Sequence, residues 1–174
     1  ELFSVMGSDV VKIHTVAEKA GPVAAAIGSE GAVGPRVVAD FGFEDAPVFD
    51  MLLVPGGAGT LTELENEAML QFLHERCAEA EIVASVCTGS ALLAKAGVLN
   101  GRRATSNKQV FALATMQSDR VEWVEQARWV EDGKFFTSSG VSAGMDMALE
   151  IIRKLWGEDS ATTAASYTEY SWHR

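Results

Sequence analysis

The sequence predicts an α/β fold in which helices cover a mostly parallel β-sheet. Two short apolar runs, at 50–54 and 82–86, each lead through a glycine-containing turn into a helical pattern. Uninterrupted apolar runs of this length are typical of strands that are buried on both faces of a sheet. A third observation is a hairpin pattern at 128–138, with Asp132 and Gly133 at the turn. Because strands alternate with helices along the chain, most strands are expected to be parallel.

In the first half of the chain, the other elements follow from periodicity and capping residues. Alternation predicts a strand at 10–16, and short extended pieces are expected at 33–43 among glycine and proline. Thr62 and Glu65 have the spacing of a capping box, which predicts a helix from there to about residue 80.

In the second half, a helix at 90–96 is expected to end at Gly97, because glycine readily adopts the left-handed conformation that follows a helix. No repeat or linker interrupts the chain, so residues 1–174 are expected to form a single domain. The remaining patterns predict a short strand at 102–105 and helices at 109–116 and 140–156.

Composition and charge exclude several classes of protein. The chain has 14 basic and 24 acidic residues and a formal net charge of −10, which argues against a nucleic-acid-binding surface. No apolar run reaches the ~18 residues that a membrane-spanning helix needs. Two cysteines make no disulfide framework, which favours a reducing cytoplasm, and no residues have the spacing of metal ligands.

Both ends of the sequence suggest a fragment of a longer protein. The chain lacks an initiator methionine, and "ELFSVMGSD" is typical of the end of a helix that began earlier. The other end stops at "EYSWHR" without a helix stop signal. We therefore expect the domain to be truncated at both ends.

Cys87 lies where the second apolar run turns into a helix. Gly89 leaves room for a tight turn, as in the nucleophile elbow of hydrolases, which holds a reactive side chain above a helix N-terminus. Backbone N–H groups and the helix dipole at this position favour a thiolate, and the Thr88 N–H can stabilise developing negative charge. The alternative is that Cys87 is a small buried apolar residue, which is how we interpret Cys77 on its amphipathic helix.

A second glycine-rich turn, "PGGAG", follows the first apolar run at 55–59. Its backbone amides, including those of Gly56 and Gly57, can form a concave anion-binding site, although a plain strand-to-helix connection explains the glycines equally well. We expect the two turns to form two halves of one oxyanion pocket. The sequence contains neither a nucleotide-phosphate loop nor a dinucleotide fingerprint.

The motifs "LLVPGGAGT", "SVCTGSALLAKAGVLNGRRATS" and "SGVSAGMDMALEII" together resemble the ThiJ/PfpI superfamily, and "SVCTGS" with "SGVSAGMD" is most similar to its isonitrile hydratase branch. The resemblance implies a flavodoxin-like three-layer sandwich related to class I glutamine amidotransferases, and a homodimer. It also places the nucleophile on Cys87, with Thr88 beside it, and oxyanion amides on Gly57 and Thr88. No cofactor is implied.

Two departures from the family pattern matter for the chemistry. The acidic residue that the family pairs with its cysteine is expected upstream of Glu1, together with the first strand of the sheet. Asn107 replaces a histidine that several branches have, so a cysteine–histidine pair is not expected. Asn107 is then a candidate substrate-binding residue. Asp146 is interpreted as a structural hydrogen-bonding residue or a dimer contact, and its alternative role is a catalytic acid.

The resemblance favours hydration of a small isonitrile to an N-substituted formamide, with Cys87 as the nucleophile. An enzyme of the glyoxalase or deglycase type that acts on reactive carbonyls is the second possibility. A third is a redox-sensing or regulatory binding domain without catalysis, since family domains also occur in transcription regulators. The expected partner is a small electrophilic molecule, with no nucleic acid and no membrane.

Overall fold

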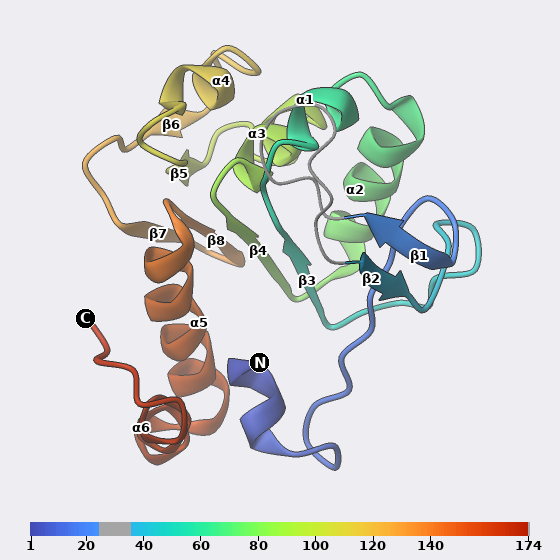
Figure 1. Ribbon diagram of the computed structural model, residues 1–174. Helices are drawn as coiled ribbons and strands as arrows, with labels where there is room; N and C mark the ends of the chain where they lie inside the picture. The colour runs from blue at the N-terminus through green and yellow to red at the C-terminus, as the bar shows by residue number, and fades with distance from the viewer. Residues whose placement is uncertain (25–35, 174) are drawn as a thin grey trace.

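The computed structural model describes residues 1–24 and 36–173 (Figure 1). A four-stranded sheet lies at its centre, in the order β3-β4-β8-β7. The first three of these strands are parallel, and β7 pairs antiparallel with β8 at the edge. The strands are β3 (Met51–Val54), β4 (Ile82–Val86), β7 (Trp129–Asp132) and β8 (Phe135–Ser138).

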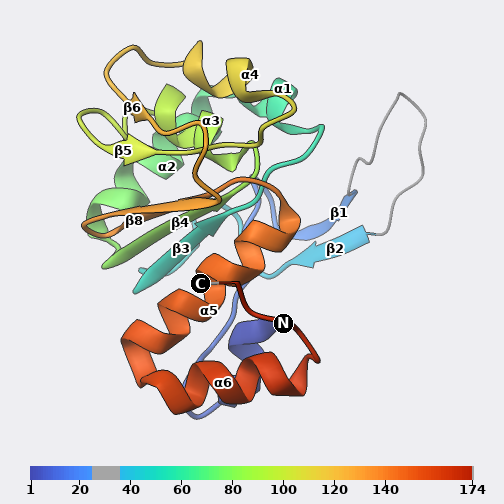
Figure 2. The ribbon, with the colours of Figure 1, turned by 90° about the vertical axis from the view of Figure 1, so that its left-hand side faces the viewer.

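Helices cover both faces of this sheet and make a three-layer sandwich (Figure 2). On one face, Val83 of β4 packs into the cluster that holds the buried residues of α2 and α3. On the other face, the neighbouring Ala84 packs with Met147 and Ile151 of α5. Burial on both faces explains why the strand has an uninterrupted apolar sequence. On one side lie α1 (Thr60–Glu63), α2 (Glu67–Glu79) and α3 (Gly89–Lys95). On the other side lies α5 (Val141–Trp156), against which α6 (Glu158–Tyr167) and the 3₁₀ helix η1 (Leu2–Met6) pack.

Two small sheets flank the central one. An antiparallel pair is formed by β1 (Gly21–Ala24) and β2 (Arg36–Ala39). A parallel pair is formed by β5 (Arg103–Ala104) and β6 (Glu122–Trp123), with the short helix α4 (Phe111–Thr115) between them in the chain. The predicted extended pieces at 33–43 therefore correspond to β2, and residues 33–35 lie outside the described residues.

The fold class and the elements near the centre of the molecule are confirmed. The runs at 50–54 and 82–86 are parallel neighbours, the hairpin turns at Gly133 with φ +62°, and Gly97 follows α3 with φ +75°. The helices predicted at 109–116 and 140–156 correspond to α4 and α5, and the short strand predicted at 102–105 corresponds to β5. The pattern did not reveal β1, β6, α6 or the 3₁₀ geometry of η1.

The strand predicted at 10–16 is wrong. Among the described residues, this stretch makes only one isolated parallel bridge, between Val16 and Phe41. Val10 and Ile13 are both more than half exposed, so the alternating side chains have no sheet face to pack on. Alternation predicts a strand only where a neighbouring strand and a buried face are available.

The predicted start of the long helix is also wrong. Thr62 lies inside the short helix α1, and α2 begins only after Asn66. The side chain of Asn66 caps α2 by accepting a hydrogen bond from the Met69 N–H at 3.1 Å. Asparagine is as good an N-cap as threonine, so the capping-box spacing identified the wrong one of two nearby candidates.

Candidate active site

Cys87 lies between the last residue of β4 and the first turn of α3, at the carboxyl end of the central strand. Its φ is +60°, a left-handed conformation that costs a residue with a side chain on the order of 1–3 kcal/mol. Its backbone N–H donates to the carbonyl of Ser138 at 3.1 Å, which ties it to the end of β8. The thiol is half-buried and not part of a disulfide. This is the strained, partly exposed geometry that the elbow predicts.

Asn107 is the side chain that points at the thiol. Its Nδ2 donates a hydrogen bond to Cys87 Sγ at 3.1 Å. Its Oδ1 accepts a hydrogen bond from the Gln109 N–H at 2.9 Å, which fixes which end of the amide faces the sulfur. A nitrogen donor held in this way stabilises negative charge on the sulfur.

The two glycine-containing turns meet at Thr88, which is buried. The Gly57 N–H donates to Thr88 Oγ1 at 3.0 Å, and Thr60 Oγ1 lies 2.8 Å from the same oxygen. A methyl group on Gly56 would clash with the Thr88 backbone nitrogen, and one on Gly89 would clash with the Val54 carbonyl. Glycine is therefore required at both positions for the turns to approach each other.

The two amides expected to stabilise an oxyanion are not equivalent. The Gly57 N–H is already bonded to the Thr88 hydroxyl. The Thr88 N–H makes no hydrogen bond to any residue that the structure describes, and it follows Cys87 directly. The Thr88 amide is therefore not committed to another described group, whereas the Gly57 amide is held by the Thr88 side chain.

Two serines that the sequence analysis missed also contact Cys87. Ser90 Oγ and Ser106 Oγ donate to the Cys87 carbonyl oxygen at 3.2 and 3.1 Å. The signal in the sequence is slight, because Ser106 is distinguished only by its position next to Asn107. Lys108, which follows Asn107, donates to Thr105 Oγ1 at 2.6 Å, and burial lowers the pKa of its ammonium.

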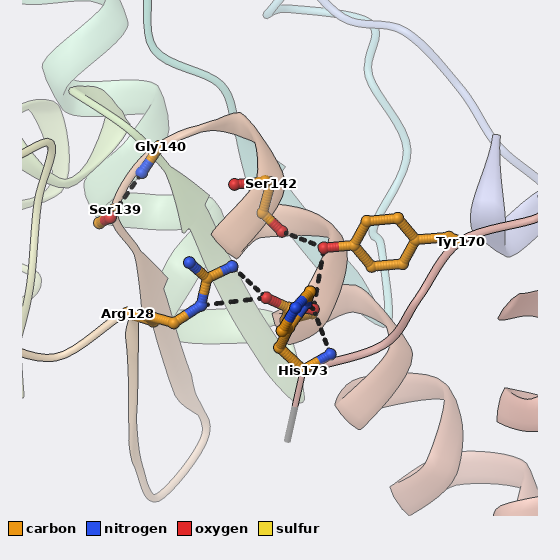
Figure 3. A network of polar contacts seen from close by, with 7 residues as sticks. Arg128, Ser139, Gly140, Ser142, Tyr170 and His173 are labelled. Atoms are coloured by element: carbon orange, nitrogen blue, oxygen red, sulfur yellow. Dashed lines mark hydrogen bonds and ion pairs between the residues drawn. The ribbon is translucent and has the colours of Figure 1, made fainter.

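Asp146 makes its hydrogen bonds with groups other than those that contact the thiol. Its carboxylate is fully buried in α5 and accepts hydrogen bonds from Tyr170 Oη and the His173 N–H, both at 2.9 Å. The guanidinium of Arg128 pairs with its other oxygen. Figure 3 shows Arg128, Tyr170 and His173 converging from three sides. This arrangement joins the segment before β7, the helix α5 and the C-terminal tail.

Two of the histidines make contacts with residues other than Cys87. His74 bonds to the Ala96 carbonyl at 3.1 Å, and His14 packs against Phe41 and Phe49. Within the described ranges, no carboxylate hydrogen-bonds to Cys87, and no three His, Cys, Asp or Glu residues gather as metal ligands do. Among the helices that the structure describes, none has the length and apolarity to cross a bilayer.

Comparison with known proteins assigns this chain to a protein family. The model of the DJ-1/PfpI family matches residues 1–154, and the chain belongs to that family. Isonitrile hydratase of Pseudomonas putida is 37% identical over 166 residues, which cover 92% of this chain and 67% of that protein. The HTH-type transcriptional regulator GbdR of Pseudomonas aeruginosa is 31% identical over 72% of this chain and 34% of its own length.

Solved structures give the same result for the fold. A crystal structure of a ThiJ/PfpI family protein from Pseudomonas syringae has a TM-score of 0.81 at 31% identity, and covers 99% of this chain and 68% of that one. An AraC family transcriptional regulator from Pseudomonas putida has a TM-score of 0.78 at 18% identity, over 96% of this chain and 86% of that one. The same domain is thus present in proteins with different names and functions.

Proposed function

We propose that this protein is a cysteine-dependent hydratase of the isonitrile hydratase type, in which Cys87 is the nucleophile. The observation that carries the proposal is the Cys87 thiol at a strained elbow with the Asn107 amide 3.1 Å from its sulfur. The 37% identity to an isonitrile hydratase supports the choice of substrate class. We also propose that the protein works as a cytoplasmic homodimer.

The reaction would proceed through a covalent intermediate on the sulfur. The Cys87 thiolate attacks the terminal carbon of the isonitrile R–NC and forms a carbon–sulfur bond. That carbon takes up one proton, which gives the thioimidate R–N=CH–S. Water then adds to the same carbon, one of its protons goes to the nitrogen and the other returns to the proton donor, and the carbon–sulfur bond to Cys87 breaks to release the formamide R–NH–CHO and the thiolate. The sum is one isonitrile and one water to one formamide.

Each group at the site has a role in this scheme. The Asn107 Nδ2–H stabilises the thiolate before attack, and the Thr88 N–H stabilises charge that develops on the substrate. Gly56 and Gly57 position Thr88. Gly56 allows the two turns to approach each other closely, and the Gly57 N–H donates to the Thr88 hydroxyl. The proton donor is proposed from the family resemblance to be an acidic residue upstream of Glu1.

Two other functions compete with this proposal. A deglycase of Pyrococcus abyssi is 36% identical over 62% of this chain, so reactive carbonyls are the second class of substrate. Because other relatives are transcription regulators, the third possible function is that of a domain that binds a ligand or senses oxidation without catalysis. Asn107 favours the hydratase, because a side-chain amide stabilises a thiolate but does not act as a general base at neutral pH.

The test is a panel of substrates on the intact natural chain, whose mass is determined first. Wild type and Cys87→Ala are each given an alkyl isonitrile or methylglyoxal, and product is followed by NMR. Formamide from the wild type alone supports the proposal. Turnover of methylglyoxal alone would replace it with carbonyl chemistry, and no turnover of either would favour a binding or sensing domain.

A further inference from the structure

The backbone carbonyl of Cys87 is held by two side-chain hydroxyls. Ser106 Oγ and Ser90 Oγ donate to it at 3.1 and 3.2 Å, one from the loop after β5 and one from the first turn of α3. Ser106 and Ser90 are both fully buried, so neither hydroxyl has water as an alternative partner. This carbonyl therefore depends on side chains that lie at different places in the sequence.

The dependence follows from the geometry of the elbow. The first hydrogen bond of α3 runs from the Ala91 N–H to the Thr88 carbonyl, so the Cys87 carbonyl lies outside the helical ladder. Cys87 also has φ +60°, which favours relaxation to a negative φ unless the surroundings prevent it. The two hydrogen bonds to the Cys87 carbonyl offset part of this backbone strain.

The Ser106 segment contacts both ends of Cys87. Ser106 holds the carbonyl, and the adjacent Asn107 donates to the sulfur. The segment is itself anchored, because the Thr105 N–H donates to Thr137 Oγ1 of β8 at 2.8 Å and Lys108 Nζ donates to the Ser106 carbonyl at 3.2 Å. Because the two contacts come from adjacent residues, a change in how Ser106 holds the carbonyl is expected to change the distance between Asn107 and the thiol as well.

We propose that Ser106, assisted by Ser90, is a positioning residue for the nucleophile. It keeps Cys87 in its left-handed conformation and keeps the sulfur within reach of the Asn107 amide. The inference rests on the proposed function only in that Cys87 is taken as the reacting group; it does not depend on which electrophile is the substrate.

The test measures the rate at which iodoacetamide alkylates Cys87 as a function of pH, in the variants Ser106→Ala, Ser106→Thr and Ser85→Ala. Loss of one hydrogen bond to the elbow is expected to slow alkylation at neutral pH by about five- to tenfold in Ser106→Ala and to move the profile to higher pH. Ser106→Thr keeps a hydroxyl and is expected to stay near wild type.

Ser85 is the matched control. It is a buried serine two residues before Cys87, and its hydroxyl makes no hydrogen bond within the described residues, so Ser85→Ala is expected to leave the profile unchanged. An unchanged profile in Ser106→Ala, or an equal fall in Ser85→Ala, overturns the proposal. If the profile shifts as expected but no isonitrile is hydrated, Ser106 remains a positioning residue and the proposed substrate is wrong.

Discussion

Cys77 and Cys87 lie ten residues apart and have opposite environments. Cys77 lies on the buried face of α2 and is 2% exposed, and burial raises the pKa of its thiol to about 12. Cys87 is half-buried, and an amide donor points at its sulfur. The burial of Cys77 agrees with its predicted place on an amphipathic helix, and Cys87 lies where it was expected, at the end of a buried strand.

At the residue scale, the contact between Asn107 and the thiol is open to a direct test. Asn107→Leu removes the donor, and Asn107→Asp places a carboxylate near the sulfur, where it repels a thiolate. Since a hydrogen bond to a charged group contributes about 1.5–3 kcal/mol, alkylation of Cys87 at neutral pH is expected to slow at least about tenfold in both. Rates are read by mass spectrometry of the Cys87 peptide.

The control for Asn107 is Gln117→Leu. Gln117 also donates through its side-chain amide, to the Leu113 carbonyl at 2.8 Å in the same part of the chain. Its loss is expected to leave the alkylation rate unchanged. If Asn107→Leu reacts as fast as wild type, the amide does not stabilise the thiolate.

The role of Asn107 could not be derived from sequence in full. The pattern "ATSN" showed that histidine is absent and that Asn107 is a candidate. It did not show the sulfur contact, because that depends on the Gln109 N–H holding the amide in one orientation. The Ser106 contact was missed for the same reason, since tertiary packing alone brings this loop to the elbow.

At the scale of elements, the junction of the two glycine-containing turns sets the site. Gly56→Ala places a methyl group 2.5 Å from Thr88 Oγ1 and against its backbone nitrogen, so the turns must separate. We expect the free energy of unfolding to fall by about 1–3 kcal/mol, which is typical of overpacking, and activity to fall with it. Chemical denaturation measures the change.

Gly59→Ala is the matched substitution in the same turn. Gly59 has φ −60° and no atom within 4 Å of the added methyl group, so this change is expected to be neutral or slightly stabilising. Equal destabilisation by the two substitutions would contradict the close-approach argument.

Sequence predicts the central elements better than the peripheral ones. The short apolar runs of β3 and β4 are best explained by strands of a parallel sheet. By contrast, 10–16 alternates without a face to pack on, and the choice between Thr62 and Asn66 as a helix cap depends on the short helix α1. Peripheral elements take their structure from neighbours that a local pattern does not reveal.

At the scale of the whole molecule, Asp146 ties the C-terminal tail to the domain. Its buried carboxylate has donors from Arg128, Tyr170 and His173. Asp146→Ala removes the charged acceptor that these groups share and is expected to lower the free energy of unfolding by about 1.5–3 kcal/mol. Glu122→Gln, at the exposed pair with Arg103, is expected to cost less than about 1 kcal/mol.

The difference between the two variants in the free energy of unfolding shows how much the buried carboxylate contributes to stability. Both are measured by denaturant unfolding at neutral pH. A loss in Asp146→Ala no larger than that in Glu122→Gln would show that the tail is not fixed through this carboxylate.

Stability is expected to fall in alkaline solution because of groups whose pKa is raised in the folded state. Burial raises the pKa of Cys77 from 9.0 to about 12, and burial and the bond to Asp146 raise that of Tyr170 above 10.0. The folded protein then retains protons that the unfolded chain releases, so stability is full below about pH 9 and declines as pH rises toward 12. In Cys77→Ala the decline is expected to be shallower, and an unchanged slope would contradict the assignment.

Capture of the covalent intermediate would show directly whether Cys87 is the nucleophile. The intact natural chain is mixed with an alkyl isonitrile, quenched in acid and digested, and the Cys87 and Cys77 peptides are weighed. We predict that the mass of one isonitrile is added to the Cys87 peptide alone, and that Cys87→Ser neither carries the adduct nor forms formamide. Formamide production by Cys87→Ser at the wild-type rate would contradict a covalent mechanism on this cysteine.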